Sequence, residues 1–230
     1  MLKRTVNVYS QKIPLKSEEE LIARCKAIEG LSFLQLATQL GIFMPSEPLK
    51  RKGWLGQAIE LALGATAGNK AIPDFSNLGI ELKTIPINQL GKPAESTFVT
   101  SIPLLTIQHE RWETSQCFTK LKRVLWLPVE GDRAIDFPHR RIGRAILWSP
   151  SPEEEGVLCK DWLDLTLLIN TGRLAEISAN MGEYLQVRPK AAHGKSLCYG
   201  FDEMGNKTLT LPRGFYLRSR FTMTICTPLP

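Results

Sequence analysis

The sequence lacks the patterns that identify the commonest cofactor and metal sites. It contains no P-loop, no G-x-G-x-x-G and no G-x-S-x-G, so it shows no recognisable nucleotide-binding loop or serine-hydrolase signature. Histidine is also scarce. The three histidines are too far apart for metal-ligand spacing and are interpreted as surface or structural residues: His109, His139 and His193.

Cysteine and long apolar runs are limited as well. The five cysteines are odd in number, scattered and without a C-x-x-C pair, which argues against a disulfide framework or a zinc site and favours buried free thiols. No run approaches the roughly 20 uncharged apolar residues of a membrane helix, and Met1–Arg4 leads into polar residues rather than a signal-peptide core. We expect a cytoplasmic protein without a membrane partner.

Basic residues are in excess. The 230 residues include 29 Lys and Arg against 23 Asp and Glu, giving a net charge of +6, which is compatible with a polyanionic partner without requiring one. The basic residues gather in short clusters: Lys50–Lys52, Lys120–Arg123, Arg140–Arg144, Arg188–Lys190 and Arg213–Arg220.

Apolar periodicity predicts helices at both ends of a central stretch of strands. Helices are expected over 17–30, 32–40 and 54–63, and again from 151 to 170 with a shorter one at 173–179. Strand-like runs occupy the middle of the chain, and two further strands are expected to pair as a hairpin. The predicted strands are 79–87, 96–107, 123–129, 144–148, 183–188 and 214–217. The fold class is therefore α/β (α+β), with a sheet flanked by helices.

One short stretch, "PDFSNLGIELK" (73–83), combines acids and a lysine at a distinctive spacing. Glu81 and Lys83 share one face of a strand, and Asp74 on the preceding turn can fold back beside Glu81. Two carboxylates with a nearby lysine suit Mg²⁺ and an attacked phosphate. The pattern D-x₆-E-x-K would nevertheless occur by chance in about one chain in twenty, and a solvated strand face is the alternative.

Two other charged residues fit the same chemistry. Glu60 lies within the apolar run Ala58–Leu63, where a buried carboxylate needs a partner or a metal; alternatively, Gln57 and Glu60 mark a solvated stripe. Lys120 can add a second lysine near the phosphate, or it is simply one residue of a solvated basic run.

Several blocks of the sequence are distinctive when taken together. They are "KGWLGQAIELALGATAGNKAIPDFSNLGIELKTIPI" (52–87), "WETS" (112–115), "KLKRVLWLPVEG" (120–131), "LWSP" (147–150), "RPKA" (188–191) and "TLPRGFYLR" (210–218). These blocks resemble the MutH family of strand-nicking DNA mismatch-repair endonucleases. The similarity runs in order from about residue 17 to about 221.

The resemblance implies a restriction-endonuclease-like mixed sheet and two lobes around a DNA cleft. All 230 residues would form one endonuclease domain, with the metal site in roughly 1–110 and sequence recognition in roughly 111–230. By motif position Asp74, Glu81 and Lys83 would be catalytic, with Lys120 as the second active-site lysine. Glu60 would join Asp74 and Glu81 as a Mg²⁺ ligand.

The same resemblance implies a set of DNA-binding residues and an activity. An Arg or Lys can read guanine and an aromatic ring can sense an adenine N6-methyl group. The matching positions are Arg188, Pro189, Lys190 and Tyr216, and Lys52 and Arg213 would be phosphate or cleft contacts. The family nicks the unmethylated strand 5′ to the G of hemimethylated GATC, uses Mg²⁺, and is activated by MutL in response to mismatch-bound MutS. A monomer with one active site would suffice.

Two alternatives remain at this point: a freestanding GATC-specific restriction-type enzyme, and a non-catalytic basic DNA-binding module with structural carboxylates. The chain also departs from the family pattern. Gln116–Thr119 replaces a stretch that commonly contains His and Arg, the Lys50–Gly53 run is a residue shorter, and the tail from Thr222 to Pro230 matches poorly. DNA contacts near 116–119 and any partner contact of the tail are therefore not implied.

Overall fold

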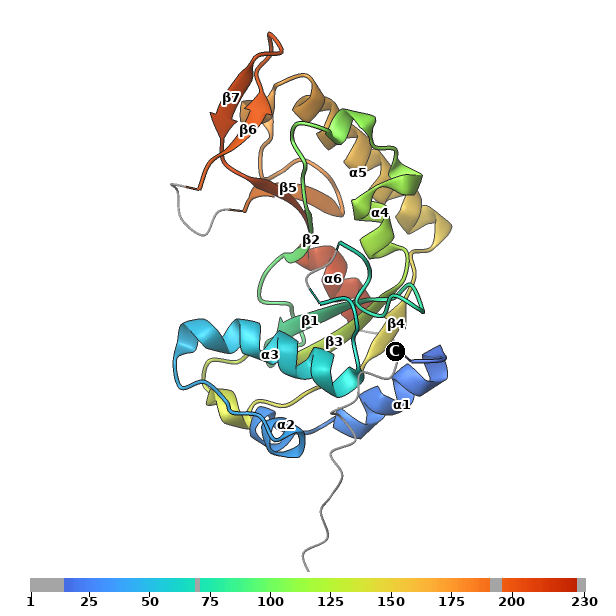
Figure 1. Ribbon diagram of the computed structural model, residues 1–230, viewed down its shortest axis with the longest axis vertical. Helices are drawn as coiled ribbons and strands as arrows, with labels where there is room; N and C mark the ends of the chain where they lie inside the picture. Colours follow the sequence, from blue (N-terminus) through green and yellow to red (C-terminus); the bar gives the residue numbers. More distant parts are fainter. Residues whose placement is uncertain (1–14, 69–70, 191–195, 227–230) are drawn as a thin grey trace, which may run out of the picture. The chain divides into compact units, whose positions relative to one another are not determined.

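The computed structural model (Figure 1) describes residues 15–68, 71–190 and 196–226. The chain divides into two compact units, and neither is continuous in sequence. Among the described residues, the first unit comprises those up to Ala94 together with Val124–Trp148, and the second comprises Glu95–Arg123 together with those from Ser149 onward. This differs from the single boundary near residue 110 predicted from the sequence. The reason is that the strands within 124–148, which follow the 95–123 segment of the second unit, belong to the same sheet as the strand at 81–87, which precedes that segment.

The first unit begins with helices α1 (Glu18–Ile28), α2 (Phe33–Leu40) and α3 (Pro48–Leu63). The predicted start of α1 is confirmed, because the Ser17 hydroxyl accepts the amide of Glu20. The Glu20 carboxylate, however, accepts the amide of Lys16 rather than closing a full capping box. Helix α3 begins six residues before the predicted start, because Pro48 occupies its first turn. The N–H groups of a first turn have no partner within the helix, so the missing N–H of proline costs no hydrogen bond there.

The sheet of the first unit has the strand order β1-β3-β4. Strands β1 (Glu81–Ile87) and β3 (Val124–Glu130) run parallel with Glu81 opposite Val124, and β4 (Ile146–Trp148) pairs antiparallel with β3. The middle strand is buried along nearly its whole length, as expected for a strand covered on both faces. Its side chains join those of the three helices in one core, which includes Leu21, Ile28, Leu36, Ile59, Leu63, Leu125 and Leu127.

The second unit contains an antiparallel sheet of order β2-β8-β5. Strands β5 (Leu185–Pro189) and β8 (Arg213–Leu217) pair with Leu185 opposite Leu217, and β2 (Thr97–Ser101) pairs with the other edge of β8. The predicted pairing of the regions 183–188 and 214–217, which correspond to β5 and β8, is confirmed. Between them lies a second hairpin that the sequence did not predict, formed by β6 (Cys198–Phe201) and β7 (Lys207–Thr210); Figure 1 shows it in orange and red.

The main helix of the second unit is α5 (Pro152–Asn170). It starts as predicted, with a complete capping box between Ser151 and Glu154 and a proline in the first turn. Two shorter helices were not predicted: α4 (Gln116–Leu121) and α6 (Ser219–Cys226). Single 3₁₀ turns occupy Ile107–His109, Trp112–Thr114, Phe137–His139 and Leu174–Glu176. Within the described ranges, none of the helices has the length and apolar character needed to cross a membrane. The predicted α/β (α+β) class is confirmed.

Candidate functional site

A tight turn places Asp74 against the first strand of the parallel sheet. Phe75 and Ile80 form an isolated antiparallel bridge, with Phe75 N donating to Ile80 O at 2.9 Å. This bridge folds the chain back so that Asp74 Oδ2 accepts the amide of Leu82 at 2.8 Å. The Asp74 carboxylate therefore lies beside the peptide that links Glu81 to Leu82. The six-residue gap in the motif corresponds to this turn.

Glu81 and Lys83 form an ion pair on one face of β1. Lys83 Nζ lies 2.8 Å from Glu81 Oε1, and the two side chains are only 5% and 13% exposed for Glu81 and Lys83 respectively. The interpretation of this pair as a solvated strand face is therefore wrong. A poorly solvated carboxylate and ammonium next to a second carboxylate provide oxygen ligands for a hard cation and a proton-transfer group at one place.

Glu60 lies on the last turn of α3, and its side chain is half-buried. Its carbonyl accepts the amides of Gly64 and Ala65, which end the helix. In the part of the chain that the structure describes, no three His, Cys, Asp or Glu side chains form a group that could hold a metal ion. Asp74, Glu81 and Glu60 are thus not assembled as a ready three-ligand site. Because Mg²⁺ in phosphate-processing sites is held by one or two carboxylates plus water and phosphate oxygens, Asp74 and Glu81 fit this ion without a third carboxylate.

The two remaining predicted lysines lie on helices. Lys120 is half-buried on α4 in the second unit. Lys52 lies on α3 in the first unit, and its side chain falls outside the described residues. Their roles toward DNA stay predictions.

A cluster of aromatic and basic side chains lies on one face of the β2-β8-β5 sheet. Phe98 on β2 is the register partner of Tyr216 on β8, and their rings meet edge to face with centroids 5.3 Å apart. The Arg188 guanidinium lies 5.7 Å from the Tyr216 ring centre, and Lys190 Nζ lies 3.6 Å from the Phe98 ring centre. We call these four side chains the aromatic–basic face. The opposite face of the sheet is part of the buried core.

Neighbouring hydroxyls and one glycine support the aromatic–basic face. Arg188 donates to the Ser96 hydroxyl, and Lys190 Nζ donates to the Ser101 hydroxyl at 3.0 Å. A side chain at Gly214, opposite Arg188 in the register, would come within 2.9 Å of the Phe98 ring. The glycine therefore leaves room for the ring to lie across β8.

Sequence reasoning found three members of this face but missed Phe98. The signal was available in "TFVT", because Phe98 precedes the buried Val99 on a strand and so points to the opposite, open face. Two other residues predicted to bind DNA, Pro189 and Arg213, lie close to this face. Pro189 is the last residue of β5 and pairs with Arg213. Arg213 is half-buried, and its Nε is a buried atom without a hydrogen-bond partner among the described residues.

The segment that departs from the family pattern forms the start of α4. The Ser115 hydroxyl accepts the amide of Phe118 and caps this helix. Cys117 is fully buried, and the Phe118 ring packs 5.3 Å from the Trp112 ring. Gln116 and Thr119 are half-buried. These four residues contribute packing and a helix start, without a basic side chain for a phosphate.

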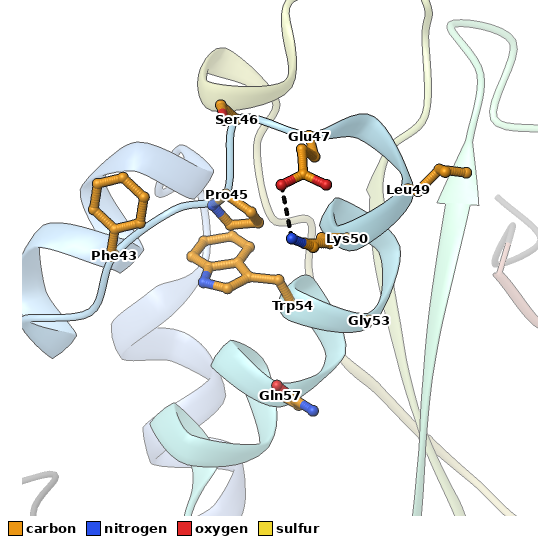
Figure 2. A pocket seen from close by; sticks show the side chains of 9 residues that line it. All are labelled: Phe43, Pro45, Ser46, Glu47, Leu49, Lys50, Gly53, Trp54 and Gln57. Carbon is orange, nitrogen blue, oxygen red and sulfur yellow. Dashed lines mark hydrogen bonds and ion pairs between the residues drawn. The ribbon is translucent and has the colours of Figure 1, made fainter.

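The first unit also contains an open pocket of about 530 Å³ beside the first half of α3 (Figure 2). An exposed ion pair between Glu47 and Lys50, 2.7 Å long, lies at its side. The pocket contains neither Asp74 nor Glu81, and it therefore is not the candidate catalytic site. Its lining residues are Phe43, Pro45, Ser46, Glu47, Leu49, Lys50, Gly53, Trp54 and Gln57.

A mixed α/β unit with one acid on a turn and a second acid and a lysine on the following strand is typical of metal-dependent phosphodiesterases. Comparison with known proteins agrees with this class: the profile of the family described as "DNA mismatch repair enzyme MutH" matches residues 63–161. The chain is 49% identical over 209 residues to the DNA mismatch repair protein MutH of Vibrio cholerae serotype O1, covering 91% of this chain and 95% of that protein. It is 50% identical over 210 residues to the Vibrio campbellii protein of the same name, covering 91% and 93%.

The Escherichia coli (strain K12 / DH10B) DNA mismatch repair protein MutH is 46% identical over 212 residues, which cover 92% of this chain and 93% of that protein. Similarity of this extent shows that the chain belongs to the MutH family. The predicted family and its enzyme class are confirmed.

Proposed function

We propose that the protein is a Mg²⁺-dependent DNA endonuclease of methyl-directed mismatch repair that nicks the unmethylated strand 5′ to the G of hemimethylated GATC. The observation that carries this proposal is the juxtaposition of Asp74 with the buried Glu81–Lys83 pair on β1. Membership of the MutH family supports the DNA substrate and the repair process. The GATC sequence, the activation by MutL downstream of MutS and a cytoplasmic, monomeric enzyme follow from the family resemblance.

The catalytic roles divide among the three side chains. Asp74 and Glu81 would hold Mg²⁺, which when bound supplies Lewis-acid stabilisation of charge on the phosphate and acidifies a water molecule. Lys83, whose Nζ lies 2.8 Å from Glu81, would orient the attacking water as an ammonium or, as a neutral amine, take its proton. By the family resemblance, Lys120 would be the second active-site lysine and Glu60 would be an additional Mg²⁺ ligand.

The aromatic–basic face suits the reading of a duplex. Arginine and lysine donate to guanine O6 and N7 in the major groove, and an aromatic ring tests the bulk beside adenine N6. Arg188, Lys190 and Tyr216 supply these groups from two paired strands, with Pro189 ending β5 between the two basic residues. Lys52 and Arg213 would contact phosphates, which position the protein without reading sequence.

A nicking assay tests the proposal. The protein is incubated with hemimethylated, unmethylated and fully methylated GATC duplexes and Mg²⁺, with and without MutL. We expect nicks in the unmethylated strand, stimulation by MutL and resistance of the fully methylated duplex. Asp74→Ala is expected to bind DNA without cutting it, whereas Asp136→Ala, an exposed acid of the same unit, serves as the matched control and is expected to cut normally.

Three results would contradict parts of the proposal. Equal cutting by wild type and Asp74→Ala would overturn the metal site. Absence of cutting under every condition would favour a non-catalytic DNA-binding module. Efficient double-strand cleavage that MutL does not change would favour a freestanding restriction-type enzyme.

A further inference from the structure

Asp161 is a buried charged residue that the catalytic proposal does not use. It lies on α5, is 5% exposed, and packs its carboxylate against the start of β5. Oδ2 accepts the amides of Tyr184 at 2.7 Å and Leu185 at 2.8 Å, and the Glu183 amide lies 2.8 Å from both oxygens. Three successive amides thus converge on one carboxylate, an arrangement that binds anions strongly.

The turn held by Asp161 is also fixed from its other side. Gly182 has φ +78°, and a side chain there would collide with the carbonyl of Leu185 and lie 3.4 Å from Asp161 Cγ. The Arg218 guanidinium donates to the carbonyls of Ala179, Met181 and Gly182 at 2.6 to 2.9 Å. Burial lowers the pKa of Arg218, whereas the nearby Asp161 charge opposes that shift. The carboxylate and the guanidinium therefore satisfy the amides and the carbonyls of one turn.

This turn determines where β5 begins. Leu185 is both the last amide bound by Asp161 and the first residue of β5, where it pairs with Leu217. Arg188 follows only three residues later. Because side chains alternate across a strand, a slip of one residue would move Arg188 and Lys190 to the opposite face of the sheet. Fixing Leu185 fixes which face presents the two basic residues.

We propose that Asp161 is a positioning residue for DNA recognition, which holds the Glu183–Leu185 amides so that β5 presents Arg188 and Lys190 in one register on the aromatic–basic face. This inference rests on the proposed function, because it takes that face to read the GATC sequence. Asp161 itself touches no DNA. Its role is comparable to that of an outer residue that orients a ligand-binding side chain.

The test compares Asp161→Asn with Asp164→Asn. Asp164 is an exposed acid on the same helix and is the matched control. The Asn variant removes the charge and places an NH₂ donor against the Glu183 amide, so it weakens the hold on the turn without changing the size of the side chain. Fluorescence anisotropy in metal-free buffer gives Kd for a GATC duplex and for a scrambled duplex, and hydrogen exchange reports on amides 183–185.

We expect Asp161→Asn to reduce the ratio of the Kd for the scrambled duplex to the Kd for the GATC duplex about tenfold, the scale of one good base contact. The affinity for the scrambled duplex should change little. Amides 183–185 should exchange faster. The nicking rate at saturating DNA should stay near wild type, because the proposed role of Asp161 is to hold the register of β5 and not to position Asp74, Glu81 or Lys83. Asp164→Asn should match wild type in all three measurements.

Asp161→Glu provides a second variant if Asp161→Asn does not fold. It keeps the charge but adds a methylene, which shifts the carboxylate relative to the three amides that it accepts, and we expect a reduced Kd ratio. A wild-type Kd ratio in a folded variant would overturn the inference and leave the proposed function intact. An equal loss for both duplexes, or failure of both variants to fold, would make Asp161 a general structural residue and overturn it. If wild type itself showed no preference for GATC, the proposed function and this inference would fail together.

Discussion

Lys83 and Glu81 carry opposite charges 2.8 Å apart in a poorly solvated part of the first unit, so a change in either residue removes a nearby counter-charge from the other. Removing one member of a buried pair is costly because the remaining ion has lost water without keeping its counter-charge. The same two groups would serve the chemistry of the site. Their contributions to stability and to catalysis must therefore be measured separately.

Lys83→Met is expected to lower the free energy of unfolding by about 3 kcal/mol in metal-free buffer, because it removes the ammonium that pairs with the buried Glu81 carboxylate at 2.8 Å. The double variant Glu81→Gln/Lys83→Met should regain most of that loss while remaining inactive. Urea unfolding at pH 7 measures both. Lys92→Met, which changes an exposed lysine of the same unit, is the control. A double variant no more stable than Lys83→Met would contradict the pairing energy assumed here.

The Cys25 thiol gives the first unit an alkaline limit. Burial, with a smaller effect of the Glu29 charge, raises the pKa of Cys25 from 9.0 to about 12. The folded state therefore keeps its proton where the unfolded chain has lost it. The contribution to stability is complete below about pH 9 and is lost as pH rises toward 12, with a slope of about 1.4 kcal/mol per pH unit.

Cys25→Ala is expected to make this decline less steep between pH 9 and 10.5, although the small cavity lowers stability at neutral pH. Part of the decline should remain, because burial also raises the pKa of Cys226, to about 11. Urea unfolding at several pH values measures the slope. Cys198→Ala, at a half-buried thiol on β6, should leave most of the slope in place. An unchanged slope in Cys25→Ala would show that another group causes the alkaline loss.

At the scale of elements, the β2-β8-β5 sheet separates packing from recognition by its two faces. Val187, Phe215 and Leu217 point into the core, while the aromatic–basic face lies on the other side. A face built from paired strands holds its side chains more rigidly than a loop would. Sequence discrimination should therefore be sensitive to single changes on this sheet.

Arg188→Met is expected to weaken binding to a GATC duplex about tenfold more than binding to a scrambled duplex, because it removes a base-reading donor and keeps the apolar stem. Competition binding at fixed salt measures the two affinities. Arg173→Met, at an exposed arginine of the same unit that pairs with Glu176, is the matched control. Equal weakening for both duplexes would assign Arg188 to phosphate contact instead.

Elements with strong local signals were predictable from the sequence. The start of α5 is specified by Ser151, Pro152 and Glu154 within four residues, and it appears where expected. The missed elements are short or lack such signals: α4 has six residues, α6 is rich in threonine, and each strand of the β6–β7 hairpin has four residues. Pairing of β1 with β3 joins residues more than forty positions apart, which no local pattern specifies.

The candidate site was predictable where the chemistry lies close in sequence. The spacing of Asp74, Glu81 and Lys83 made them candidates, and the family resemblance selected them; they lie together because a turn and a strand connect them. Phe98 and Asp161 escaped notice, since Phe98 gains its meaning from Tyr216 on another strand and Asp161 from amides 22 to 24 residues away. The predicted three-carboxylate group depended on the side-chain placement of Glu60, which a helical pattern does not determine.

At the scale of the whole molecule, the net charge of +6 should govern DNA affinity through released counterions. If about six phosphates are contacted, Kd for a duplex should rise by ~10³ over a fourfold increase in salt. Lys52→Met should reduce the slope of log K against log salt by about one, whereas Lys92→Met should not change it. Filter binding across a salt series measures the slopes. An identical slope in Lys52→Met would remove Lys52 from the phosphate contacts.

The interleaving of the two units also affects how the protein is made. The first unit lacks its central strand β3 until residues 124–130 have left the ribosome, by which time the first excursion into the second unit, Glu95–Arg123, has already been synthesised. Neither unit can therefore finish folding as an independent early product of translation. A chain that stops near residue 123 would expose the unpaired edge of β1, together with Glu81 and Lys83, and would be a substrate for chaperones and proteases rather than a small working nuclease.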